Sequence, residues 1–182
     1  ARRIVIERGA GALTFDELAA VSGVTRGGIT YHFPTKEALL SALVEEDVEQ
    51  WRSAQAALAP AHDDSETARL LAAIRLAAGK DEEQKRFVSG MLSAVTLEPS
   101  LLRPCRNYFE ETFGREHWSD ADLRRFLLRL AADGLFWLEV FRLYEVPPAV
   151  RERLVALLED LAVRWGDDAE PRAAVPGARH GP

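Results

Sequence analysis

The sequence predicts an all-α protein in which a small N-terminal helical domain is joined by one long helix to a C-terminal helical bundle. No alternating run of β-branched residues lies between turn residues, so strand signals are almost absent. Residues that cap helices recur along the chain, and apolar residues recur at steps of three or four. The length of 182 residues fits one moderate domain or two small ones.

Two short helices are expected near the N-terminus. The run Thr14-Phe15-Asp16-Glu17 fits a capping box, in which the threonine and glutamate side chains each satisfy a free backbone N–H group. It predicts a helix over about residues 15–21, ending at Gly23. Thr25 predicts a second helix over about 26–31, which must stop before Pro34. The tight turn between them has the spacing of a helix-turn-helix.

Thr35 begins a third helix, which is expected to be long. It covers about residues 36–58, because no breaker occurs before Pro60, and it would span roughly 36 Å, enough to connect two cores. Residues 166–182 are rich in Gly, Pro, Ala and charge, and are expected to form a poorly structured tail. Further helices are expected over about residues 65–79, 83–97, 100–114, 120–144 and 148–165, with Ser119 capping the fourth of these.

Composition excludes several classes of function. No apolar run approaches the roughly 20 residues that span a bilayer, so we expect a cytoplasmic protein with no membrane partner and no signal peptide. Cys105 is the only cysteine and cannot form an intramolecular disulfide. The net charge is −6, yet residues 1–45 hold five basic and five acidic side chains. Any contact of this first part with phosphate is therefore local rather than driven by a broad positive field.

The second short helix carries the main candidate site. An inward face is expected from Leu18, Ala19, Val21, Val24 and Ile29, closed by Phe15 and Phe33. The outward edge is polar and carries Thr25, Arg26, Gly27, Gly28, Thr30, Tyr31 and His32. A helix in the major groove presents its first residues to base edges, so Arg26 can pair with guanine, and Thr25 or Thr30 can meet a phosphate or a thymine methyl. The adjacent glycines weaken the helix but let its backbone approach DNA closely.

The run AAVSGVTRGGITYHFPTKEALL, residues 19–40, resembles the DNA-binding domain of TetR/AcrR-type bacterial transcriptional regulators. The resemblance is dense over about residues 4–45 and concerns only the layout beyond residue 50. It implies a homodimer with a DNA-binding domain at 1–45, a ligand-binding and dimerisation domain at 46–165, and the tail. Because such regulators usually start with a basic arm and this chain starts inside the first helix, we expect residues to be missing upstream.

The resemblance also implies which residues contact DNA. They are Thr14, Thr25, Arg26, Gly27, Gly28, Thr30, Tyr31, His32 and Lys36, with Lys36 and Thr14 expected at phosphates. Alternatives stay open for three of them. Tyr31 can belong to the core, His32 can be a plain surface residue, and Lys36 can be a solvated lysine at a helix start.

The expected ligand-binding and dimerisation domain, residues 46–165, is called the body here. It is expected to bind an apolar or amphipathic small molecule among its central helices. The candidate lining residues are Trp51, Phe87, Met91, Val95, Phe109, Phe113, Phe136 and Trp137, and Arg106, Asn107, Tyr108 and Asp133 are candidates for orienting the molecule. Since a bundle of this size needs a core, each of these side chains can also be purely structural.

The last two helices are expected to form a dimer interface, because they carry more apolar surface than a monomer needs. The candidates are Phe126, Leu127, Leu130, Gly134, Leu138 and Phe141 on one helix, and Leu154, Leu157, Leu158, Leu161 and Trp165 on the other. Two helices from each subunit would pack about a two-fold axis. Such a dimer predicts operator half-sites about 34–36 Å apart, or a multiple.

No enzymatic motif is evident. The four histidines are scattered, none follows a glutamate by three residues, and CxxC, HExxH and GxSxG are absent, so we expect no catalytic residue, metal site or cofactor. The expected function is a ligand-responsive repressor that binds a palindromic double-stranded DNA operator as a homodimer and is released by a small effector. The alternative is a dimeric helix-turn-helix protein whose body only dimerises and senses no ligand.

Overall fold

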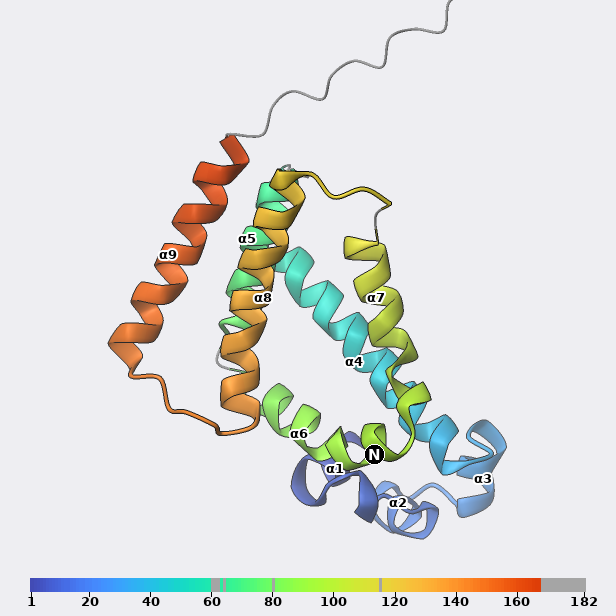
Figure 1. Cartoon of the computed structure of the whole chain (residues 1–182). Helices are drawn as coiled ribbons and strands as arrows, with labels where there is room; N and C mark the ends of the chain where they lie inside the picture. The colour runs from blue at the N-terminus through green and yellow to red at the C-terminus, as the bar shows by residue number, and fades with distance from the viewer. Residues whose placement is uncertain (60–62, 64, 80, 115, 168–182) are drawn as a thin grey trace, which may run out of the picture.

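The computed structural model describes residues 1–59, 63, 65–79, 81–114 and 116–167, and in this part of the chain it contains helices and turns but no strand (Figure 1). The predicted all-α class is confirmed. The α-helices are α1 (Arg2–Arg8), α2 (Phe15–Ser22), α3 (Arg26–His32), α4 (Lys36–Leu58), α5 (Glu66–Ala77), α6 (Glu82–Leu97), α7 (Arg103–Phe113), α8 (Asp120–Val140) and α9 (Pro148–Asp167), and the 3₁₀ helices are η1 (Ala10–Ala12) and η2 (Pro99–Leu102).

Local capping explains where most of these helices begin. In each case a side-chain oxygen accepts a hydrogen bond from the backbone N–H three residues later, which satisfies one of the donors that a helix start leaves free. The caps are Thr14, Thr25, Thr35, Ser65, Asp81 and Ser119, for α2, α3, α4, α5, α6 and α8. Ser119 forms a full capping box with Asp122. The box predicted at Thr14 is only half formed, because the Glu17 carboxylate pairs with Arg8 instead.

Several of the predicted boundaries differ from the structure. The helix expected over 100–114 divides into η2 and α7. The helix expected over 120–144 ends at Val140, because Arg142 takes a left-handed conformation with φ of 51° and turns the chain. The last helix continues to Asp167, so the first two residues of the predicted tail are helical. The rest of that tail, 168–182, lies outside the described residues.

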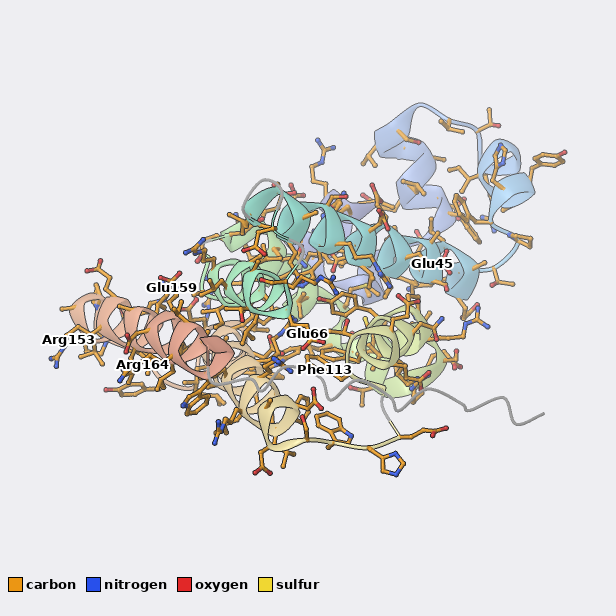
Figure 2. All side chains as sticks on the ribbon, turned by 90° about the horizontal axis from the view of Figure 1, so that it is seen from above. Glu45, Glu66, Phe113, Arg153, Glu159 and Arg164 are labelled. Carbon is orange, nitrogen blue, oxygen red and sulfur yellow. The ribbon has the colours of Figure 1, made fainter. Side chains whose placement is uncertain are left out.

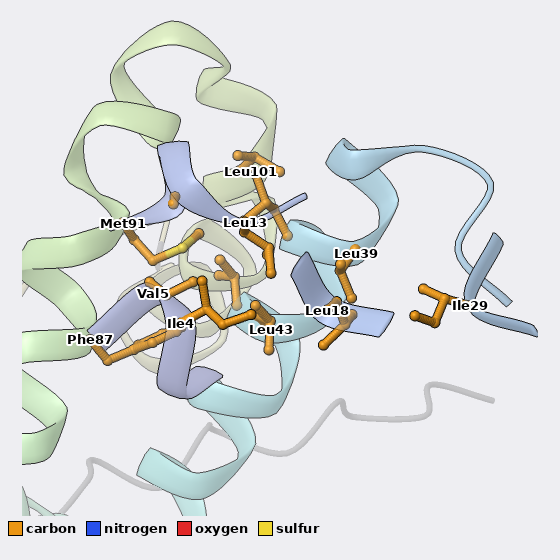
Figure 3. Packing of buried hydrophobic residues seen from close by; sticks show 13 residues of the cluster. Ile4, Val5, Leu13, Leu18, Ile29, Leu39, Leu43, Phe87, Met91 and Leu101 are labelled. Carbon is orange, nitrogen blue, oxygen red and sulfur yellow. The ribbon is translucent and has the colours of Figure 1, made fainter. Parts of the chain in front are cut away.

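The N-terminal helices and the start of α4 form a head, whose buried side chains we call the head core (Figure 3). Two members of the head core, Phe87 and Met91, come from α6 and pack against Ile4 and Val5 on α1. The whole set is Ile4, Val5, Ala10, Leu13, Leu18, Ile29, Leu39, Leu40, Leu43, Val44, Phe87, Met91 and Leu101. The head is therefore completed by a helix that is distant in sequence.

The expected inward face of the short helices is only partly correct. Leu18 and Ile29 are buried, and Phe15, Ala19 and Phe33 pack partly buried against the head core. Val21 and Val24, however, are 43% and 49% exposed. Helices of seven and eight residues make about two turns, so only one position on each of α2 and α3 reaches full burial.

The body core lies between α5, α8 and α9 (Figure 1). Its buried residues are Leu70, Ile74, Ala77, Leu128, Ala132, Leu158 and Ala162. The long helix α4 connects the two cores, as predicted: Leu39, Leu40 and Leu43 near its start belong to the head core, and Trp51 packs against the body core. Burial of these apolar side chains, each stabilising by about 1.5–3 kcal/mol, holds the two ends of α4 in separate clusters.

Candidate functional site

Helix α3 presents a polar edge on a small apolar anchor. Ile29 is buried and lies at the edge of the head core, on the side of Leu18 and Leu39 (Figure 3). The hydroxyl of Thr25 accepts from the N–H of Gly28 at 3.1 Å and fixes the first turn. On the opposite side, Tyr31 is 82% exposed and its ring meets that of His32 edge-to-face at 5.2 Å. This exposure excludes the reading of Tyr31 as a core residue.

Arg26 forms an ion pair across the helix-turn-helix. Its Nη1 donates to both carboxylate oxygens of Asp16, at 2.7 and 2.6 Å. Both side chains are largely exposed, so the pair contributes at most about 1 kcal/mol to stability. Since both bonds use Nη1, the Nε and Nη2 donors remain able to face the two acceptors of a guanine.

The two glycines of α3 differ in their surroundings. A Cβ at Gly27 would meet nothing within 4 Å, which leaves the backbone there open to a large partner. A Cβ at Gly28 would lie 3.3 Å from both the Thr25 hydroxyl and a Val24 methyl group, so the cap is packed closely around this glycine. Close approach of another molecule to the backbone is therefore easiest at Gly27.

The predicted phosphate contacts lie beside the same surface. Lys36 donates from Nζ to the carbonyl oxygen of Gly11 at 3.1 Å, and the Thr14 hydroxyl accepts from the Glu17 N–H at 3.1 Å. The hydroxyl of Thr30 donates to the carbonyl of Gly27 at 3.2 Å. An ammonium group has three donors and a hydroxyl can donate while it accepts, so Lys36 and Thr14 can still bind a phosphate.

The predicted effector-binding residues do not form one group. Trp51 and Phe136 meet edge-to-face, with ring centroids 5.8 Å apart, and line a cavity of about 380 Å³. Phe87 and Met91 lie in the head core instead, with Val95 packed against it, and their assignment to a body cavity was wrong. They were misassigned because nothing in the local pattern of α6 reveals that this helix faces the head.

Phe109 and Phe113 belong to a row of aromatic side chains that runs along α7 to the start of α8. Phe109 and Phe113 stack at 6.1 Å, and Phe113 meets Phe126 at 5.1 Å. Trp137 stacks on Phe141 at 5.6 Å and is exposed. Arg106 is exposed and donates to the carbonyl of Pro99 at 3.1 Å. In this structure these side chains do not line the cavity at Trp51.

Two of the polar candidates, Tyr108 and Asp133, contact Arg129, a buried residue that was not among the candidates read from the sequence. Arg129 is 3% exposed, and its Nε donates to both oxygens of Asp133 at 2.9 and 3.0 Å. Its Nη1 lies 3.4 Å from the hydroxyl of Tyr108, which in turn donates to Gln55 at 2.7 Å. Burial by itself lowers the pKa of Arg129, but Asp133 and Tyr108 outweigh that effect and keep the guanidinium charged. An arginine four residues before an aspartate in an apolar stretch was the available signal.

A second ionic cluster joins α6 to the ends of α8 and α9. The Glu139 carboxylate accepts from Lys85 at 2.5 Å and from Arg151 at 2.8 Å, and Lys85 also binds Glu82 at 3.1 Å. Burial alone raises the pKa of Glu139, but Lys85 and Arg151 outweigh it and hold that pKa below its ordinary value. The cluster lines an open hollow of about 830 Å³ whose rim includes Phe141 and Tyr144.

An apolar stripe, which we call the α8 stripe, runs along the outer side of α8. Its members follow each other at steps of three or four and are Leu123, Leu127, Leu130, Gly134, Trp137 and Phe141. Helix α9 adds Val150 and Leu157, which are also exposed. Figure 2 shows α8 and α9 at the end of the molecule opposite to α2 and α3.

Several predicted interface residues lie elsewhere than expected. Leu158 is buried in the body core, so its assignment to the interface was wrong. Leu161 and Trp165 pack partly against that core, and Phe126 belongs to the aromatic row. Leu138 and Leu154 are half-buried. The helix period explains why Leu158 is buried. Neighbouring residues of a helix point in different directions, so Leu158 lies on the inner face of α9 while Leu157 lies on the outer face.

The described part of the chain offers little support for metal binding, membrane insertion or thiol chemistry. No group of three or more His, Cys, Asp or Glu side chains could hold a metal ion there. None of the helices described is both long and apolar enough to cross a membrane. Burial raises the pKa of the Cys105 thiol, so this cysteine is a poor nucleophile at neutral pH.

Comparison with known families gives two matches that together cover most of the chain. Residues 1–43 match the family described as bacterial regulatory proteins, tetR family. Residues 67–163 match the family described as tetracyclin repressor-like, C-terminal domain. No curated protein matches the sequence at a significant level.

Solved structures share the fold at low sequence identity. A putative TetR-family transcriptional regulator from Rhodococcus sp. is 15% identical, with a TM-score of 0.66 over 91% of this chain and 94% of that one. A putative transcriptional regulator from Saccharomonospora viridis, solved in complex with choline, is 18% identical, with a TM-score of 0.64 over 87% and 89%. A TetR family regulator from Pseudomonas syringae pv. tomato is 19% identical, with a TM-score of 0.59 over 91% of each chain.

Proposed function

The chain belongs to the TetR family of bacterial transcriptional regulators, and we propose that it is a homodimeric repressor that reads a palindromic operator with α3 and releases it when a small effector binds. The observation that carries this proposal is the polar, exposed edge of α3 on its apolar anchor, Ile29. An edge of this kind is what the major groove requires of a reading helix.

For operator recognition, we assign base reading to the start of α3 and phosphate contacts to the residues around it. Arg26 faces a guanine, while Thr25, Thr30, Tyr31 and His32 contact the groove or its edges. Thr14 and Lys36 bind phosphates, and the open backbone at Gly27 and Gly28 permits the close approach. Basic and acidic side chains are equal in number over residues 1–45, so phosphate contacts of this part are local rather than driven by a broad positive field.

For dimerisation, we propose that the α8 stripe and the exposed side of α9 pack against their copies in a second subunit. A monomer would leave a continuous apolar surface in water, and a two-fold arrangement of four helices buries it. The same two-fold axis relates the two heads. This arrangement sets the spacing of the half-sites at about one DNA turn or a multiple.

For the effector, we propose the cavity lined by Trp51 and Phe136. Its volume of about 380 Å³ lies within the range of small-molecule sites. The choline complex of a protein with the same fold supports an effector of this size class. The alternative, a body that only dimerises, is less favoured because it leaves this aromatic-lined cavity without a role.

Selection of bound DNA from the genome of the source organism tests the proposal. We expect inverted repeats with half-sites about 10 base pairs, or a multiple, from centre to centre, together with a dimeric mass by light scattering. Recovery of no sequence preference at low salt would refute operator reading. A monomer that still selects single half-sites would refute the dimeric arrangement alone.

A further inference from the structure

We propose that the cavity lined by Trp51 and Phe136 binds a small organic cation, of the quaternary ammonium class. This inference rests on the effector response proposed above and names the chemistry of the effector. It is carried by the placement of two aromatic rings, by the distribution of charge around the cavity, and by the helices that supply its wall.

The aromatic wall suits a positive charge that is not strongly hydrated. Trp51 on α4 and Phe136 on α8 stand at 71° to each other with centroids 5.8 Å apart, and both line the cavity. Two rings at this angle form a corner into which a methylated ammonium group fits, within about 6 Å of an aromatic face. Apolar methyl groups on the cation also lose their contact with water there.

The charges around the cavity favour a cation over an anion. Among the residues that the structure describes, the lining carries Arg2 and Lys85 against Asp81 and Glu83, and the two cations also pair with Asp47, Glu82 and Glu139, which lie outside the lining. Arg2 lies 2.8 Å from a carboxylate oxygen of Asp47, and Lys85 lies 2.5 Å from one of Glu139. An anion would therefore find both of these cations already paired with carboxylates, whereas a cation would meet the negative charges of Asp81 and Glu83 in the lining.

Glu83 is the carboxylate best placed to attract the ligand. Its side chain is 67% exposed and lies 3.9 Å from the Nε of Arg2, so its negative charge is only loosely compensated. Asp81, by contrast, is occupied as the cap of α6, where it accepts from the N–H of Gln84 at 2.9 Å. We therefore assign the aromatic corner to binding and Glu83 to electrostatic attraction at the rim.

The cavity also reaches the head. Arg2 on α1 lines it, and the same guanidinium donates to Asp47 on α4 at 2.8 Å and to Gln84 on α6 at 2.7 Å. Gln84 in turn donates to Asp47 at 2.9 Å, so the three side chains close a ring across three helices. A ligand in the cavity thus touches a hydrogen-bonded junction between the body and the DNA-reading head.

Three small aromatic compounds of similar size test the assigned class by calorimetry on the full chain. Phenyltrimethylammonium carries the positive charge, dimethylaniline is its neutral relative, and benzoate is an anion. We expect phenyltrimethylammonium to bind about tenfold more tightly than dimethylaniline, the preference that a desolvated cation–π contact supports. We expect benzoate to bind more weakly than either.

Variants locate the binding. Trp51→Leu and Phe136→Leu should each remove the preference for the cation, and Glu83→Gln should weaken cation binding about threefold without affecting dimethylaniline. Trp118→Leu and Glu110→Gln are the matched controls, since neither residue lines the cavity, and both should bind as the parent does. Glu83 is largely exposed, so its variant keeps the test valid even if a ring variant does not fold.

Equal binding of the cation and its neutral relative, binding of none of the three compounds, or unchanged cation binding in both Trp51→Leu and Glu83→Gln would overturn the proposal. These results are independent of operator binding, which is measured separately on the ligand-free protein. Loss of operator binding in the parent would refute the proposed function and leave the ligand class standing.

Discussion

Gly90 sits where α6 crosses α1, and replacing it with alanine should separate the two helices. A Cβ built at Gly90 lies 2.3 Å from the backbone carbonyl oxygen of Val5 and 3.1 Å from its carbonyl carbon. Contacts of real Cβ atoms essentially never fall below 3.0 Å, so the helix must move by several tenths of an ångström. The obstacle is backbone rather than a flexible side chain, and it lies beside Phe87 and Met91, which complete the head core.

The magnitude follows from two opposing effects. Alanine favours a helix over glycine by about 1 kcal/mol, but overpacking a well-filled core costs about 1–3 kcal/mol and sometimes more. Because the clash is with backbone, we expect the cost to prevail and the free energy of unfolding to fall by about 1–2 kcal/mol. For a chain of this size each kcal/mol corresponds to a decrease of about 2–4 °C in melting temperature.

Gly27→Ala is the matched control, because it places the same methyl group in a helix of the head with nothing within 4 Å. It should leave the melting temperature unchanged or raise it slightly. Both variants are compared by calorimetric or circular dichroism melting without DNA. A Gly90→Ala protein that melts with or above the parent would show that α6 does not press on α1 as described.

The other predictions concern DNA reading, dimerisation and acid stability. Arg26→Ala should lose about 1–3 kcal/mol of affinity per half-site and flatten the preference at one base pair, whereas Lys36→Ala should weaken all sequences alike and reduce the salt slope by about one per subunit in fluorescence titrations. Leu127→Asp, at a position 57% exposed, should shift the protein to a monomer in light scattering while its helix content stays unchanged. Because the pKa of Glu139 lies below its ordinary value of 4.5, its contribution to stability is present above that pH and disappears as the pH falls through the lowered pKa. Glu139→Gln should therefore reduce the unfolding free energy at pH 7 by about 1–3 kcal/mol and lessen its loss in acid, and equal acid slopes in parent and variant would contradict this.

The helices were predictable from the sequence because their signals are local. Thr25 and Ser119 cap the helices that they were expected to cap, since a side-chain cap involves residues three apart. The end of α8 was missed by four residues, because the left-handed turn at Arg142 is made by a residue type that seldom adopts it. Local patterns thus give the existence of elements more reliably than their ends.

The candidate sites also differ in how far they could be predicted from local sequence patterns. The surface of α3 could be read from the sequence, because a short helix with one anchor, Ile29, leaves its remaining positions exposed. The effector residues could not, because Phe87 joins the head and Trp51 joins the body through contacts between elements far apart in the chain. Periodicity tells which residues are buried but not which of two cores receives them.

The two cores have a consequence for how an effector signal reaches DNA. Helix α4 connects the two cores, and α6 does so as well, because it contributes Phe87 and Met91 to the head core and Gln84 to the wall of the cavity. A packed core resists gradual deformation, so a displacement of α6 at the cavity cannot leave α1 in place. Ligand binding and operator release would then be coupled through two helices, α4 and α6, which both pack into the head core. Under this arrangement a change confined to α4 weakens the coupling between effector binding and operator release. Only the loss of the contacts of both α4 and α6 with the head removes that coupling.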